Sequence, residues 1–174
     1  MTHSRAVRRL RASVFVMGLC LVASSCANGL AFTKDERLTI TSPRSHEHVS
    51  LPVTISWRVS NFRITGPDGA SDPDAGYFGV FIDRTPVPPG KPLSWIARDD
   101  RRCARVPGCP DTTYLADRRV HSTSDTSFTF EHLPDLGAYR GRERHEVTVV
   151  LLDGSGKRIG ESAWFVAFKY DRAL

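Results

Sequence analysis

Two histidines separated by one residue, His46 and His48, are the best candidates in this sequence for metal binding. Alternate residues of an extended segment project to the same side, so both imidazoles could meet one Zn²⁺ or Cu²⁺ ion. A complete site needs a third ligand, which would have to come from the distant His121, His132 or His145. A polar loop between strands is the simpler interpretation. Metal binding through His46 and His48 is therefore kept as the alternative function, and we expect no cofactor.

Cys103 and Cys109 are the only cysteines after residue 26. The chain between them contains the turn signal Pro107-Gly108, which would let it double back. Their spacing matches no C-x-x-C motif, so a redox-active or metal-binding pair is the less favoured alternative. We predict a structural disulfide between them. So short a ring contributes about 2 kcal/mol by loop entropy, which rigidifies a loop but does not hold a domain.

Three aspartates, Asp68, Asp72 and Asp74, lie in a loop rich in glycine and proline. Their carboxylates could offer oxygen ligands to Ca²⁺. The spacing does not match an EF-hand loop, in which alternate ligands precede a glycine and a distal glutamate. Turn geometry explains the same composition and is the favoured interpretation.

The sequence contains no motif for an activated nucleophile or a phosphate-binding loop. G-x-S-x-G, H-E-x-x-H, the P-loop and G-x-G-x-x-G are all missing from it. His145 beside Glu146 comes nearest to a catalytic pair, and only a pocket with histidine and carboxylate in contact would support catalysis. We therefore predict that the protein is not an enzyme.

A cluster of basic residues follows a proline-rich run at 84–92. The cluster consists of Arg98, Arg101, Arg102 and Arg105, and a second one spans 139–144. Such clusters are commonly solvated loops. If they converge with the proline-rich run, they could form a recognition surface, because arginine and aromatic residues are favoured in interface hot spots.

The first 26 residues combine a basic start, an apolar run at 12–25 and a cysteine, Cys26. The run is too short for a membrane-spanning helix, which needs about 20 apolar residues. It resembles a bacterial lipoprotein signal, with Ala23 and Ser25 at the lipobox positions before Cys26. The resemblance implies that Cys26 becomes the lipid-modified first residue, anchored to the cell membrane and facing the extracytoplasmic side. An ordinary signal peptide cut nearby, or an uncleaved anchor, is the alternative.

The positive charge of the chain belongs largely to this signal. The full sequence has a formal charge of +5, and residues 1–26 hold four arginines and no acidic residue. The remaining chain carries only +1, so the inference from a basic protein to nucleic acid fails. We expect no nucleic-acid partner.

Three segments follow from these features. They are a lipoprotein-type signal peptide at 1–25, the lipidated cysteine and a tether at 26–36, and one domain at 37–174. In the domain the dominant pattern is period-two alternation, broken by glycine, proline and aspartate, which predicts strands.

The expected strands are 38–41, 53–59, 77–83, 127–130, 146–152 and a last one within 158–170, with 93–97 as a possible short strand and 114–120 as a strand or one helical turn. The strand at 77–83 is apolar on both faces and should be central. The turn at 153–156 predicts a hairpin between the last two strands. The four prolines of 84–92 predict an extended surface connection.

The segment from Ile40 to Pro43, followed by Leu51 to Trp57, resembles the opening of immunoglobulin-like and fibronectin type III-like domains of bacterial surface proteins. The resemblance covers about 38–59 and the final hairpin. It implies an all-β fold, a single antiparallel β-sandwich of about seven strands. No cysteines stand where an intersheet disulfide is expected, and another small antiparallel barrel or sandwich is the runner-up. The expected core residues are Trp57, Phe81, Val149 and Phe165.

These observations predict a membrane-anchored extracytoplasmic lipoprotein that acts as a binding or structural module. Its expected partners are the membrane, through the lipid anchor, and a protein or other component of the cell envelope. The sequence names no ligand, because loops on a rigid sandwich bind by many chemistries.

Overall fold

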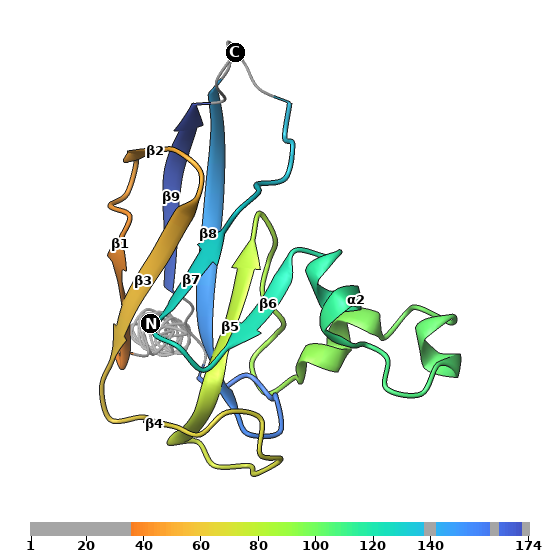
Figure 1. Cartoon of the computed structure of the whole chain (residues 1–174). Coiled ribbons are helices and arrows are strands. Elements are labelled where there is room, and N and C mark those ends of the chain that lie inside the picture. The colour runs from red at the N-terminus through yellow and green to blue at the C-terminus, as the bar shows by residue number, and fades with distance from the viewer. Residues whose placement is uncertain (1–35, 138–141, 161–163, 172–174) are drawn as a thin grey trace, which may run out of the picture. The chain divides into compact units, whose positions relative to one another are not determined.

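The computed structural model describes residues 36–137, 142–160 and 164–171, and within them two sheets and a single α-helix. The smaller sheet has the strand order β1-β3-β7 and is antiparallel throughout. Its strands are β1 (Leu38–Ser42), β3 (Val53–Val59) and β7 (Ser127–Phe130). The expected strands at 53–59 and 127–130 are confirmed at both ends. Figure 1 shows β3 and β7 lying across the second sheet.

The second sheet has six strands in the order β2-β9-β8-β5-β4, with β6 also paired to β5. They are β2 (His48–Val49), β9 (Trp164–Asp171), β8 (Arg142–Asp153), β5 (Ala75–Ile82), β4 (Arg63–Ile64) and β6 (Val120–Thr123). The all-β class is confirmed. The sheet is mixed, however, because β2 runs parallel to β9 and β4 parallel to β5. The described residues form nine strands, two more than the seven expected, since two-residue strands leave no alternation to detect.

Strand β3 packs one face into the core between the two sheets. Val53, Ile55 and Trp57 are buried, whereas Thr54 and Arg58 are exposed, as alternation predicts. The Trp57 ring meets Phe78 of β5 edge to face, with centroids 5.3 Å apart. This contact joins the two sheets.

Strand β5 is buried along its whole length, which confirms that it is central. Phe78, Val80 and Ile82 belong to the core between the sheets. Tyr77 and Phe81 point to the opposite face and belong to a second core. The strand is apolar on both faces because both faces of the sheet are covered at this point.

The second core is covered by residues 84–119, which we call the cap and which Figure 1 shows in green beside β5 and β6. The cap contains two 3₁₀ helices, η1 (Leu93–Ala97) and η2 (Cys103–Arg105), and helix α2 (Thr112–Ala116). Val87, Leu93 and Leu115 are the cap residues buried in this second core. The proline-rich run is largely exposed, as expected of a surface connection, although its Val87 is buried in the second core. The expectation of a short strand at 93–97 was wrong, because this segment is a 3₁₀ helix. The backbone N–H groups of Trp95 and Arg98 bond locally, to the carbonyls of Pro92 and Trp95, instead of to a neighbouring strand.

The hairpin of β8 and β9 is confirmed, with Val147 opposite Val166 and Val149 opposite Trp164. Of the expected core residues, Trp57, Phe81 and Val149 are buried. Phe165 is 61% exposed, so its placement in the core was wrong. Val166 and Phe168 of the same strand pack into the core between the sheets. Because side chains alternate along a strand, Phe165 faces outward.

Candidate functional site

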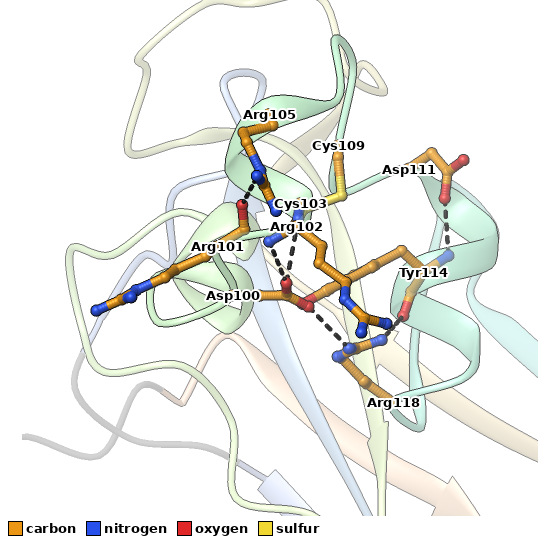
Figure 2. Close-up of a disulfide and its surroundings, with 9 residues drawn as sticks. All are labelled: Asp100, Arg101, Arg102, Cys103, Arg105, Cys109, Asp111, Tyr114 and Arg118. Atoms are coloured by element: carbon orange, nitrogen blue, oxygen red, sulfur yellow. Dashed lines mark hydrogen bonds and ion pairs between the residues drawn. A yellow bond between two sulfur atoms is a disulfide. The ribbon is translucent and has the colours of Figure 1, made fainter.

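The predicted disulfide between Cys103 and Cys109 is present, with 5.3 Å between the Cα atoms. Figure 2 shows it closing the loop that leads from η2 toward helix α2. Cys103 is buried, and Cys109 is partly covered. The disulfide therefore ties an exposed loop to the packed part of the cap.

The carboxylate of Asp100 organises the same loop, as Figure 2 shows. It accepts hydrogen bonds from the backbone N–H groups of Cys103 at 3.1 Å and Arg102 at 2.9 Å, and from the Tyr114 hydroxyl at 3.0 Å. Arg118 forms an ion pair with it at 3.2 Å. The hydrogen bond from Cys103, with the others, holds the pKa of Asp100 below its usual value, while burial and the bond to Asp100 raise the pKa of Tyr114. Asp100 thus links helix α2 to the loop 103–109, which the disulfide closes and which we call the stapled loop.

The proline-rich run and the arginine cluster converge on Trp95. The Lys91 ammonium lies 4.6 Å, and the Arg98 guanidinium 5.0 Å, from the ring centroid. Arg118 stacks on Tyr114 at 3.5 Å. Cation–π contacts of this kind favour a fixed placement of the charged groups.

The cap is much more basic than the chain as a whole. Residues 84–119 contain eight Lys and Arg but four Asp, a formal charge of +4, whereas residues 27–174 carry only +1. Four exposed arginines, Arg98, Arg101, Arg102 and Arg105, form what we call the arginine surface. A charge count by segment would have revealed this asymmetry from the sequence.

A groove with a volume of about 640 Å³ lies between the cap and the six-stranded sheet. Its lining consists mainly of hydroxyl-bearing side chains, prolines and buried apolar or aromatic side chains, together with one aspartate and one glycine. They are Pro67, Tyr77, Pro92, Leu93, Ser94, Pro110, Asp111, Thr112, Leu115, Ser122, Thr123, Ser124, Ser155 and Gly156. The sequence did not reveal this site, because its residues come from six separate segments.

Four hydroxyl groups of the groove are available to a ligand. Ser94, Thr112, Ser122 and Ser124 are exposed, and within the described part of the chain their side chains form no hydrogen bond. By contrast, the Ser155 hydroxyl donates to Asp153 at 2.6 Å. The four free groups come from η1, from α2 and from the end of β6 with the turn after it.

Buried side chains form the floor of the groove. Tyr77, Leu93 and Leu115 are each less than 9% exposed and belong to the second core. Burial, together with the nearby charge of Asp153, raises the pKa of Tyr77. A tyrosine phenol is protonated at neutral pH even without such a shift, so Tyr77 is a hydrogen-bond donor at the floor.

Among the described residues, Asp111 is the only charged one that lines the groove. One of its oxygens, Oδ1, accepts a hydrogen bond from the backbone N–H of Tyr114 at 2.7 Å and caps helix α2. None of the eight basic residues of the cap lines the groove. The positive charge of the cap is therefore kept away from this site.

His46 lies in the exposed turn before β2 and His48 is the first residue of that strand, and neither shares a site with the other described histidines. The His48 Nδ1 pairs with Asp171 at 2.9 Å, and the His46 backbone, with φ of 65°, donates to the Ala167 carbonyl. The described residues contain no group of three His, Cys, Asp or Glu side chains that could hold a metal ion. His121 packs instead against Phe128, with ring centroids 4.8 Å apart.

The aspartates of the loop before β5 serve structure in different ways. Asp72 pairs with Arg63 and Asp74 with Arg37, both at 3.0 Å. Asp68 accepts from the backbone N–H of Ala70 at 2.9 Å, a turn contact. These bonds agree with the interpretation from turn geometry.

His145 contacts carboxylates other than the neighbouring Glu146. Its Nδ1 lies 2.7 Å from Asp83 Oδ2, and its Nε2 lies 3.3 Å from Glu143 Oε2. Glu146 itself is exposed, because it points to the opposite face of β8. His145 is 0% exposed, so its contact with Asp83 lies in the protein core and not at a pocket open to a substrate.

Cys26 and the signal segment lie outside the described residues, as do 139–141 of the second basic cluster, whereas its residues 142–144 begin strand β8. Among the described residues no helix is both long and apolar enough to cross a membrane.

No family model, curated protein or solved structure matches this chain. The functional proposal therefore rests on the residues and their geometry.

Proposed function

We propose that this protein is a lipid-anchored extracytoplasmic binding module and that the groove under the cap receives its ligand. The observation that carries the proposal is the set of four free hydroxyl groups, at Ser94, Thr112, Ser122 and Ser124, around a preformed groove. Ligand sites are concave, largely preformed and lined by apolar side chains with a few directed polar groups. The groove has each of these properties.

The rigidity of the cap supports binding at this place. The disulfide, the Asp100 contacts and the second core each restrict a different part of the cap. A site that is ordered before binding loses less conformational entropy when the ligand arrives. The cap side of the groove is thus preorganised for binding.

Features of the sequence support both the lipid anchor and the extracytoplasmic location. The basic start, the short apolar run and Cys26 are typical of a lipoprotein signal. The disulfide is consistent with an oxidising compartment outside the cytoplasm. The tether at 26–36 would connect the lipid to the domain.

We also assign the domain to the immunoglobulin-like sandwiches in the broad sense. Two packed sheets and a core tryptophan in β3 support the assignment. The cap and the two short parallel strands would be additions to that plan.

Metabolic labelling with an alkyne analogue of palmitate tests the anchor. The protein should be labelled, and Cys26→Ala should abolish the label. Cys20→Ala is the matched control, because this cysteine lies in the apolar run and should leave labelling intact. Undiminished labelling of Cys26→Ala would contradict the proposal.

Binding to isolated cell envelopes of the native host tests the groove. The purified protein should sediment with the envelopes, and Ser94→Trp should reduce binding strongly, because the indole would fill the groove. Ser60→Trp adds the same side chain at an exposed position outside the groove. Equal binding by the protein and Ser94→Trp would show that the groove is not the site.

A further inference from the structure

We infer that the ligand of the groove is a neutral carbohydrate, an uncharged polyhydroxylated chain of the cell envelope. This inference rests on the proposed function and adds the chemical class of the ligand. It draws on the charge, the hydrogen-bonding groups and the apolar surfaces of the groove.

The distribution of charge disfavours an anionic ligand in the groove. The cap carries eight basic residues, yet none of them lines the groove. In Figure 2, Asp111 at the groove and Arg101 of the arginine surface lie on opposite sides of the stapled loop. A phosphate or carboxylate ligand would meet Asp111 without a compensating cation, which costs electrostatic free energy. An uncharged ligand pays no such cost.

The free hydroxyl groups match the hydrogen-bonding pattern of a sugar. Each Ser or Thr hydroxyl can both donate and accept, and it rotates to suit its partner. Sugar hydroxyls have the same double capacity. Asp111 adds a carboxylate acceptor and Tyr77 a protonated phenol at the floor. The groove therefore offers complementary partners to several ring hydroxyls at once.

The apolar part of the lining fits the other surface of a sugar, its C–H face. Pro67, Pro92 and Pro110 contribute rigid apolar rings, and Leu115 and Tyr77 close the floor. Proline rings lose no side-chain rotamer entropy when they are covered. The volume of about 640 Å³ accommodates a short segment of a longer chain.

Periodate and protease treatment of the envelopes separate a sugar from a protein ligand. Periodate cleaves the vicinal diols of sugars, whereas a protease removes exposed proteins. We expect the protein to lose its binding to periodate-treated envelopes. Binding that survives periodate overturns the carbohydrate inference, whatever the protease does.

The variant Ser94→Trp distinguishes failure of the carbohydrate inference from failure of the proposed function. If binding survives periodate but Ser94→Trp still fails to bind, the groove is a site for another class of ligand. If Ser94→Trp binds like the unmodified protein, the proposed function itself is wrong. Ser60→Trp reports any general effect of an added tryptophan.

A glycan array with neutral and anionic oligosaccharides then gives the specificity. We expect binding to neutral glycans, with an affinity about tenfold lower in a double variant, Ser122→Ala with Ser124→Ala, because two hydrogen bonds are lost. Ser60→Ala should bind like the unmodified protein. Binding confined to sulfated or phosphorylated glycans would overturn the inference and point to the arginine surface.

Discussion

The hydroxyl of Tyr114 donates a hydrogen bond of 3.0 Å to the carboxylate of Asp100 and so joins helix α2 to the disulfide-stapled loop. Helix α2 also begins at the edge of the groove, through Asp111 and Thr112. The contact between Asp100 and Tyr114 therefore positions one wall of the proposed binding site.

Tyr114→Phe should loosen the cap without unfolding the sandwich. The variant removes only the hydroxyl, so that Asp100 loses one partner while the ring and its contact with Arg118 remain. We expect faster amide exchange within 100–118 and unchanged exchange in β3 and β8. Tyr170→Phe, on strand β9 and outside the cap, is the control. Unchanged exchange in the cap would contradict this role of the hydroxyl.

Removal of the disulfide should lower stability by a modest amount. Cys103→Ser with Cys109→Ser opens a short ring, for which loop entropy predicts a loss of about 2 kcal/mol in the free energy of unfolding. The two sheets should stay folded, because neither cysteine belongs to the hydrophobic clusters of the domain. Denaturant unfolding measures the loss, and proteolysis within 103–109 should be accelerated. Global unfolding of the double variant would contradict this account.

Asp153 should make the free energy of unfolding depend on pH in the acid range. It is 4% exposed and accepts from Ser155, Lys157 and Ser71. Burial alone would raise its pKa, but these hydrogen bonds together hold the pKa below the usual value. Since the folded pKa is the lower one, its contribution is full above about pH 4 and is lost as the pH falls through the folded pKa.

Asp153→Asn should therefore cost about 1–3 kcal/mol in unfolding free energy at pH 7 and less at pH 3. Denaturant unfolding at the two pH values measures the difference. Asp72→Asn, which removes a carboxylate from a surface ion pair, is the control and should change little. A loss of equal size at both pH values would argue against the pKa shift.

The buried His145 should matter for stability far more than the exposed His48. His145→Leu removes the imidazole that contacts Asp83 and Glu143 in the core, and breaking a buried pair costs about 3–5 kcal/mol. His48→Leu removes a surface pair with Asp171 and should leave stability unchanged within error. Thermal unfolding compares the two. Similar effects of both substitutions would contradict the structural role of His145.

The sheets were largely predictable because alternation is a local signal. Val53 to Val59 alternates apolar and polar residues, and the strand occupies the same range. The two-residue strands β2 and β4 were missed because they contain too few residues to show a period. The outward face of Phe165 was missed because the whole segment around it is apolar.

The cap and the groove could not be predicted because they depend on contacts between distant segments. Val87, Leu93 and Leu115 are isolated among prolines and charged residues, and only the fold brings them onto Tyr77. The free hydroxyls have no motif, since serine and threonine are common in turns. The disulfide was predictable because its two cysteines are close in sequence.

Hydrogen–deuterium exchange of the protein bound to solubilised envelope material of the native host tests the central claim most directly. The account predicts slower exchange in the three segments that carry the free hydroxyls, 92–94, 110–112 and 122–124, and no such protection in Ser94→Trp. Protection confined to 98–105, the region of the arginine surface, would contradict binding in the groove.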